Sequence, residues 1–167
     1  LPLGMSDPEP RDKEWRGSDP TILFVCPDLA FNSYYRQIYD EFVTDFGDLP
    51  YKIGGSQPIQ FHDPHVLGYL PTEAYARNMR EFRVMFYHSR EPNHVHYHPF
   101  EAIRAGMPLV FMAGSLLDRL GGIGLPGRCE TVSSAREKLQ AILAGDRALI
   151  EEIRSSQLSL LEPMHPD

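Results

Sequence analysis

The feature that most limits the fold of this chain is a repeated alternation of short apolar runs with helix-like segments. The apolar runs, in chain order, are TILFVCP, YKIGGS, HVLGYL, VMFYHS, PLVFMA and CETVS. Continuous apolar runs of this length suit strands that are buried on both faces, and the amphipathic segments between them supply the covering helices. The alternation predicts an α/β fold, a three-layer sandwich around a mostly parallel sheet of about six strands.

The helices predicted between these strands have recognisable starts. Thr72 is a predicted N-cap for the segment PTEAYARNMREF, and Ser134 and Glu137 form a predicted capping box for the segment that follows CETVS. Pro99 suits the first turn of a helix, which places His98 at the N-cap.

The chain divides by composition into one domain and two short terminal segments. Residues 1–20 are rich in proline and charge and lack periodicity, so they are predicted to form a flexible tail or linker. Residues 21–162 hold all the predicted elements, and 163–167 are a predicted C-terminal tail. A chain of 167 residues is long enough to bury a substantial core in this one domain.

Charge and cysteine content exclude some functions. The net charge of −7 argues against general nucleic-acid binding, which depends on a basic surface. Cys26 and Cys129 are too few for a disulfide framework and lack the spacing of a zinc site. We find neither a run of 18 apolar residues nor a signal-peptide pattern, so a cytoplasmic location is expected.

A ligand of such a fold is expected at the carboxyl ends of the strands, where the connecting loops meet. Gly55 and Ser56 follow the second run, and glycine there lets backbone approach a phosphate or forms a plain tight turn. Tyr69 lies near the end of the third run, where a base commonly stacks in domains of this kind. The connection after VMFYHS is rich in histidine side chains, which favours a functional loop over a simple connection between elements.

The segment His98-Pro99-Phe100-Glu101 leads from that connection into a helix. The free amides of Phe100 and Glu101 at a helix start are predicted to favour an anion. A carboxylate at Glu101 could accept two hydroxyl groups of a sugar ring, or it could simply complement the helix dipole.

The segment HPFEAIRAGMPLVF resembles the nucleotide-sugar signature of GT-B glycosyltransferases. In the C-terminal, Rossmann-like domain of that family, a Glu-Ala pair opens a helix, a Gly-x-Pro ends it, and an apolar strand follows. Glu101-Ala102, Gly106, Pro108 and Leu109 to Phe111 match this layout. The order of elements matches from Thr21 to Glu162, so the resemblance implies one half of a GT-B fold.

The resemblance implies an enzyme, a glycosyltransferase, of which this chain is the donor-binding half and is inactive alone. Glu101 would bind the ribose hydroxyls of a nucleotide sugar, and the loop before it would face the diphosphate and the donor sugar. The acceptor would bind a missing N-terminal domain. The family's common use suggests bacterial surface polysaccharide or lipopolysaccharide synthesis at the inner face of the membrane, with peripheral membrane association of the full enzyme. No metal or cofactor is implied besides the donor substrate.

The chain departs from the family at one site residue. Many retaining members carry a first glutamate eight residues before the second, and Asn93 occupies that position here. Glu91 precedes a proline as the family's first glutamate does, but it lies ten residues before Glu101. Either Glu91 or Asn93 could therefore fill this place, which leaves the retaining or inverting outcome open.

Three alternating histidines, His94, His96 and His98, allow a second interpretation of the same loop. In an extended segment all three side chains would face one side, as contacts to a diphosphate or a sugar, or as ligands of a metal. The alternative function is therefore a metal-binding α/β domain or a metal-dependent hydrolase. A third alternative is a non-catalytic, receiver-like or scaffolding domain, which is less favoured because Asp28 is the only acid after the first strand.

Overall fold

The structure, a computed structural model, describes residues 4–165 and is an α/β fold around one parallel sheet. The sheet has five strands in the order β2-β1-β3-β4-β5, and every neighbouring pair is parallel. The strands are β1 (Asp19–Val25), β2 (Tyr51–Gly54), β3 (Phe82–Tyr87), β4 (Leu109–Met112) and β5 (Arg128–Cys129). The predicted Rossmann-like class is confirmed, with five strands instead of about six.

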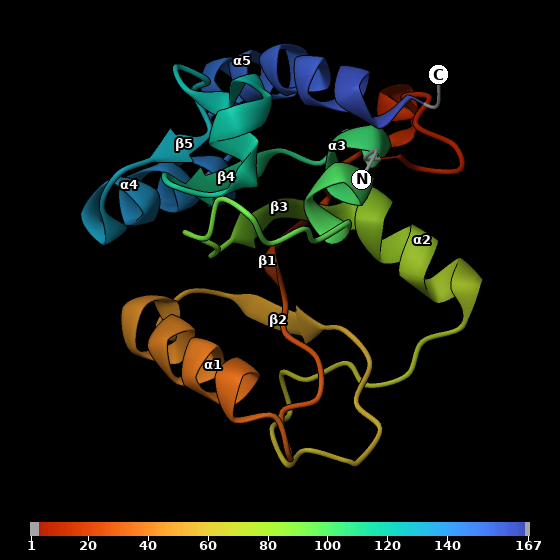
Figure 1. Ribbon diagram of the computed structural model, residues 1–167, viewed down its shortest axis with the longest axis vertical. Coiled ribbons are helices and arrows are strands. Elements are labelled where there is room, and N and C mark those ends of the chain that lie inside the picture. The colour runs from red at the N-terminus through yellow and green to blue at the C-terminus, as the bar shows by residue number, and fades with distance from the viewer. Residues whose placement is uncertain (1–3, 166–167) are drawn as a thin grey trace.

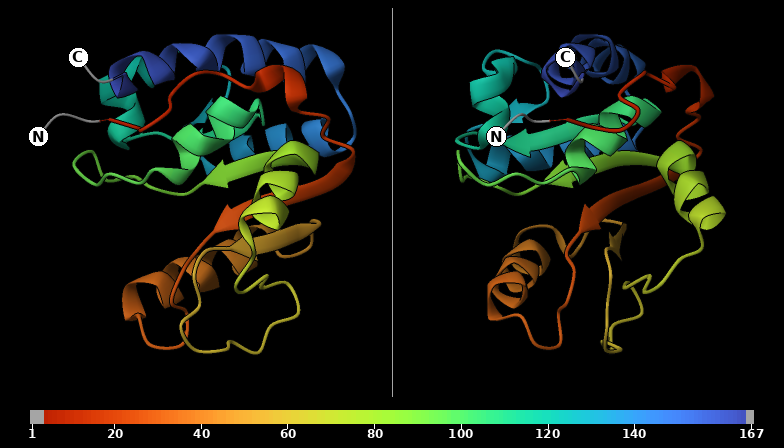
Figure 2. Two further views of the ribbon diagram at one scale, coloured as in Figure 1. Left: turned by 90° about the vertical axis from the view of Figure 1, so that its right-hand side faces the viewer. Right: turned by 45° about the vertical axis from the view of Figure 1, so that its right-hand side comes forward.

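The run HVLGYL accounts for the missing strand. Only Val66 pairs with the sheet, through an isolated parallel bridge to Ile53 of β2. Pro64 and Pro71 bound the run, and Gly68 adopts a positive φ of 67°, so the backbone cannot continue an extended ladder. The 55–71 connection is therefore a wide loop that extends beyond the edge of the sheet (Figure 2).

Helices cover both faces of the sheet, as Figure 1 shows. The α-helices are α1 (Ser33–Phe46), α2 (Thr72–Glu81), α3 (His98–Ala105), α4 (Val132–Leu143) and α5 (Arg147–Gln157). Three shorter helical turns are η1 (Asp12–Glu14), η2 (Asp118–Gly122) and η3 (Leu158–Met164). None of the helices within residues 4–165 is long and apolar enough to cross a membrane.

Two apolar cores lie on opposite sides of the sheet because successive side chains of a strand point to opposite faces. Ile22 and Phe24 of β1 pack with α1 and α4, whereas Leu23 joins the core beneath α2, α3 and η3. In the first core the rings of Phe24 and Phe42 stack with their centroids 4.1 Å apart. The sheet is thus buried on both faces, as its continuous apolar runs predict.

Three of the predicted helix starts are wrong by one to three residues. The N-cap of α3 is Tyr97, so His98 lies inside the first turn, and the N-cap of α2 is Pro71, so Thr72 does too. The hydroxyl of Thr131 caps α4 by accepting a hydrogen bond from the Ser134 amide at 3.1 Å. The edge strand β5 already ends at Cys129, so α4 begins at Val132, earlier than the capping-box pattern suggests.

Residues 4–18, which the sequence predicts to be part of a tail or linker, contact the folded domain at several points. Trp15 Nε1 donates a hydrogen bond to the carbonyl oxygen of Phe82 at 3.0 Å. The guanidinium of Arg154 lies 4.5 Å from the centre of the Trp15 ring. At the other end of the chain Met164 is fully buried. Residues 1–3 and 166–167 lie outside the described residues.

Candidate functional site

A cavity of about 580 Å³ lies at the carboxyl ends of β1 and β2, beside the first turn of α3. Four residues predicted from the sequence line it: Gly55, Ser56 and Tyr69 from the 55–71 connection, and Glu101 from the first turn of α3. The chain brings them together because parallel strands end at one edge of the sheet. A cavity therefore lies at the edge of the sheet where the sequence predicts a ligand site.

Glu101 occupies the polar end of this cavity. It lies in the first turn of α3, which begins at His98 with Pro99 in the position where proline is favoured. The side chain is half-buried, and its Oε2 accepts a hydrogen bond from the hydroxyl of Tyr75 on α2. The carboxylate is therefore held by a neighbouring helix, while the cavity lies on its open side.

The expected free amides at the start of α3 are only partly available. The amide of Glu101 donates to the carbonyl oxygen of Tyr97 at 3.0 Å, so it belongs to the helix and is not free. The side chain of Phe100 is 1% exposed and packs in the core with Ile103. Pro99 is also buried, so these two residues position Glu101 and do not line the cavity.

Gly55 makes the turn that closes the cavity on the side of β2. Its φ is 106°, and a Cβ there would lie 3.1 Å from the backbone nitrogen of Pro27. The turn is fixed by two hydrogen bonds, from the Cys26 amide to the Gly54 carbonyl and from the Asp28 amide to the Ser56 carbonyl. Glycine is required here by the close packing of two backbones, which is the tight-turn alternative given by the sequence.

Tyr69 and Ser56 are exposed on the rim of the cavity. The Tyr69 side chain is 88% exposed, and it lies between this cavity and a hollow formed by the rest of the 55–71 loop. An exposed ring beside a half-buried carboxylate can stack on a flat heterocycle while the carboxylate accepts hydroxyl hydrogens. Leu23, Val25 and Leu67 complete an apolar wall, and none of the described lining residues is Lys or Arg.

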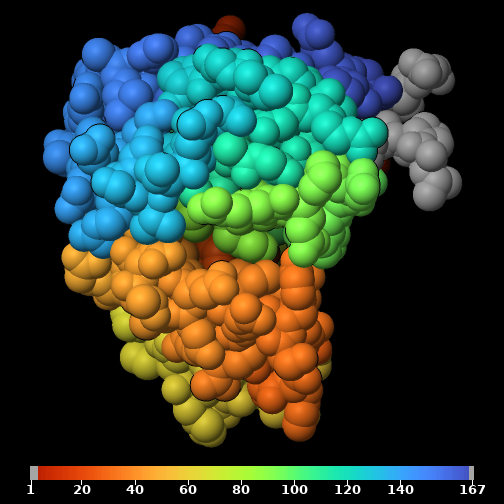
Figure 3. Space-filling model, turned by 60° about the vertical axis from the view of Figure 1, so that its left-hand side comes forward, coloured from red at the N-terminus to blue at the C-terminus, as the bar shows by residue number. Residues whose placement is uncertain are grey.

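The connection between β3 and α3 places its predicted site residues elsewhere. The carboxylate of Glu91 lies 2.9 Å from Nδ1 of His94, and Asn93 accepts a hydrogen bond from Arg119 at 2.6 Å. Neither Glu91 nor Asn93 lines the cavity beside Glu101. Glu91 instead lines a hollow of about 280 Å³ between α1 and α4, which Figure 3 shows as a crevice beneath the loop.

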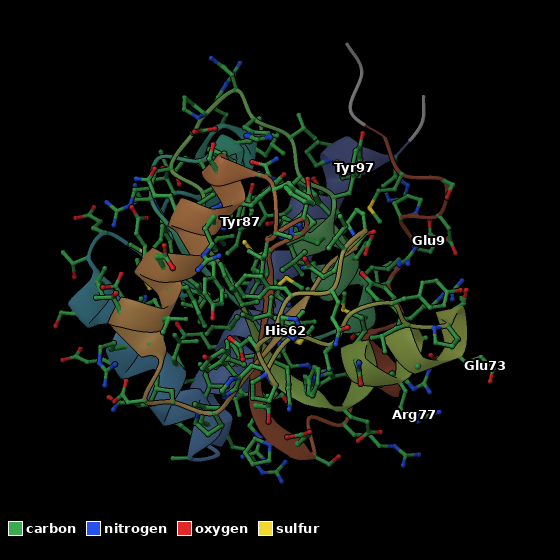
Figure 4. All side chains as sticks on the ribbon, turned by 90° about the horizontal axis from the view of Figure 1, so that it is seen from below. Glu9, His62, Glu73, Arg77, Tyr87 and Tyr97 are labelled. Carbon is green, nitrogen blue, oxygen red and sulfur yellow. The ribbon has the colours of Figure 1, made fainter. Side chains whose placement is uncertain are left out.

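The alternating histidines form a row of rings. The centroids of His94 and His96 are 4.0 Å apart, those of His96 and His98 are 5.3 Å apart, and His88 lies 5.9 Å from His96. Four buried ring nitrogens have no hydrogen-bond partner within residues 4–165: both of His88, and Nε2 of His96 and His98. The histidines thus pack on each other and on Tyr87, which lies in the interior of the molecule (Figure 4).

Burial keeps these imidazoles neutral. Burial, together with the neighbouring His96, lowers the pKa of His88 to about 4. It likewise lowers the pKa of His96 to about 4, and the pKa of His98 falls well below its usual value for the same reason. At neutral pH these three rings therefore add no positive charge that could balance a diphosphate.

The geometry of the histidine row also bears on whether these side chains could bind a metal ion. Within the described part of the chain, no three side chains among His, Cys, Asp and Glu are arranged so that they could hold a metal ion. The row of imidazole rings is instead a packed element of the β3–α3 connection.

Sequence reasoning missed the residues that α2 contributes to the cavity. Thr72, Tyr75 and Asn78 line it at intervals of three residues, which places them on one face of the helix. This spacing can be seen in the segment PTEAYARNMREF, but the sequence does not show which element packs against that face. Only the packing of α2 beside α3 shows that the face lies next to Glu101.

Fold and site together define the class of this protein as a Rossmann-like α/β domain with a carboxylate-lined cavity at the carboxyl ends of β1 and β2. A scan of protein-family models and a search of curated proteins each found no match to the chain.

Proposed function

We propose that this domain binds the nucleotide part of a nucleotide-sugar donor and belongs to a glycosyltransferase. The observation that carries the proposal is the convergence of Gly55, Ser56, Tyr69 and Glu101 on one cavity. The sequence predicts all four as ligand-binding residues. Glu101, the residue that the resemblance assigns to the ribose, lies inside the cavity and not on a distant surface.

The chemistry of the cavity suits a nucleoside. Tyr69 offers a flat exposed ring for the base, and the Glu101 carboxylate offers oxygens for the ribose hydroxyls. The diphosphate and sugar would extend toward the β3–α3 connection, where His94 is half-buried and Arg119 is exposed. Transfer would require the acceptor domain, so we expect this chain alone to show no transferase activity. Turnover by this chain alone would contradict that part of the proposal.

Calorimetric titration with UDP, GDP, ADP and dTDP, with and without EDTA, tests the proposal. We expect at least one nucleotide to bind, and EDTA to leave its affinity unchanged. Glu101→Ala should weaken that binding by roughly tenfold to a hundredfold, because hydrogen bonds to a charged group contribute about 1.5–3 kcal/mol.

Glu73→Ala is the matched control. Glu73 lies on the outward face of α2 and does not line the cavity (Figure 4). Its removal deletes the same carboxylate charge without changing the site. Absence of binding by all four nucleotides would overturn the proposal, and equal effects of the two substitutions would remove Glu101 from the site.

A further inference from the structure

The contact between Tyr75 and Glu101 joins two helices that belong to different crossovers of the sheet. Tyr75 lies in the middle of α2 and Glu101 in the first turn of α3, 26 residues later in the chain. Their hydrogen bond runs from the phenol hydroxyl to Oε2 of the carboxylate. Within residues 4–165, Tyr75 is the only side chain that forms a hydrogen bond with this carboxylate.

The pair also forms a wall. Thr72, Tyr75 and Glu101 line both the 580 Å³ cavity and a second hollow of about 330 Å³ between α2 and α3. The second hollow is lined by Arg11 and Arg104 among others. Without the phenol, the Glu101 side chain would be free to turn toward these guanidinium groups and away from the cavity.

The phenol is a dependable donor at any ordinary pH. Burial raises the pKa of Tyr75, and the adjacent Glu101 carboxylate raises it further, so the hydroxyl keeps its proton. A donated proton at Oε2 leaves Oε1 and the remaining lone pairs of the carboxylate for hydroxyl groups in the cavity. One rotamer of Glu101 is therefore selected before a ligand arrives.

We propose that Tyr75 is a positioning residue that holds the Glu101 carboxylate toward the cavity and so makes the site select ribonucleotides over nucleotides that lack ribose hydroxyls. This inference rests on the proposed nucleotide-binding function and adds a discrimination that the function does not require. The physical reason is preorganisation, because a carboxylate that is already ordered loses less side-chain entropy when it binds two hydroxyls.

The test compares UDP, GDP and ADP with their 2′,3′-dideoxy counterparts by calorimetry. The ratio of ribo to dideoxy affinity isolates the part of binding that uses Glu101. For the wild-type chain we expect a ratio of roughly ten to a hundred for the best-bound base. Tyr75→Phe should lower this ratio by about fivefold to tenfold while the affinity for the dideoxy nucleotide stays the same. Glu101→Ala should bring the ratio near one, and adding Tyr75→Phe to it should change nothing further.

Tyr39→Phe is the matched control because the hydroxyl of Tyr39 donates to the carboxylate of Asp63, in the same kind of phenol–carboxylate pair. Tyr39 does not line the cavity, so its loss should lower the melting temperature without changing the ratio. If Tyr75→Phe weakens ribo and dideoxy nucleotides equally, or leaves the ratio unchanged, the positioning role is wrong while nucleotide binding stands. If no nucleotide binds the wild-type chain, both proposals fail together.

Discussion

The hydroxyl oxygen of Tyr87 lies 2.7 Å from Nδ1 of His96, inside a cluster of neutral imidazoles. This bond satisfies one ring nitrogen of His96, whereas the buried Nε2 has no hydrogen-bond partner among the residues that the structure describes. Such unpaired polar groups are rare in folded proteins, because each gives up its hydrogen bonds to water without replacement. The β3–α3 connection is therefore held by packing that depends on the histidines staying uncharged.

The first prediction concerns the pH dependence of stability. The folded pKa of His88 and of His96 is about 4, below the ordinary value of 6.5, so the unfolded chain binds more protons between these values. Stability should be constant above about pH 6.5 and fall as the pH drops toward 4. His88 alone should account for about 2 kcal/mol of loss between pH 7 and pH 5. Urea unfolding at half-unit pH intervals measures this loss, and a flat profile from pH 7 to 5 would contradict it.

The second prediction isolates His88. Replacing it with leucine removes two unpartnered nitrogens, so the change at pH 7 should be small or stabilising by up to about 1 kcal/mol. The loss of stability between pH 7 and pH 5 should shrink by about 2 kcal/mol, because one titrating group is gone. His62→Leu, at an exposed position, should leave the slope of the pH profile unchanged. Equal slopes for wild type and His88→Leu would show that this imidazole does not control acid sensitivity.

The third prediction compares two glycines with the same backbone conformation. Gly106 and Gly145 both have a φ of 87°, but a Cβ on Gly106 would lie 2.6 Å from Cα of Asp12, whereas a Cβ on Gly145 would meet nothing within 4 Å. Gly145→Ala should cost about 1–2 kcal/mol from the left-handed conformation alone. Gly106→Ala should cost more and displace the η1 segment. The emission of Trp15, the single tryptophan, should then shift to longer wavelength in Gly106→Ala only. Equal losses of stability in the two variants would mean that the close approach of Asp12 does not add to the cost of Gly106→Ala.

The fourth prediction concerns a buried amide. The side chain of Gln157 is 2% exposed, accepts a hydrogen bond from the Leu109 amide and donates one to the Met107 carbonyl, both at 2.9 Å. Gln157→Leu keeps the approximate volume but leaves both backbone groups unpaired, so it should destabilise the fold by about 2–4 kcal/mol. Gln140→Leu, on the exposed side of α4, should change stability by less than about 0.5 kcal/mol. Chemical denaturation of both variants makes the comparison, and a small effect at Gln157 would refute the bridging role.

The class of the fold and the edge of the sheet where a site is expected follow from the pattern of residues along the chain. Continuous apolar runs such as TILFVCP can be buried only inside a sheet covered on both faces, so the alternation leaves few other solutions. Gly55 is readable as a turn because glycine at the end of a strand allows a tight turn, and the resemblance to the GT-B family implies that Gly106 ends its helix. Glu101 was readable as a site residue because proline two positions earlier fixes the start of its helix.

Which of the candidate residues lie next to one another depends on how the helices and strands pack. Periodicity assigns a residue to a face of its own element but does not say which other element covers that face. Glu91 and Asn93 were predicted beside Glu101, yet their partners are His94 and Arg119. The sequence does not point to Tyr75, because its partner lies 26 residues away on another helix.

The segment HVLGYL shows a strand that the sequence predicts and the structure lacks. Its prolines and its left-handed glycine leave a single residue that pairs with the sheet through an isolated bridge. Contacts between distant segments are set by the packing of the whole chain, so local sequence patterns do not predict them.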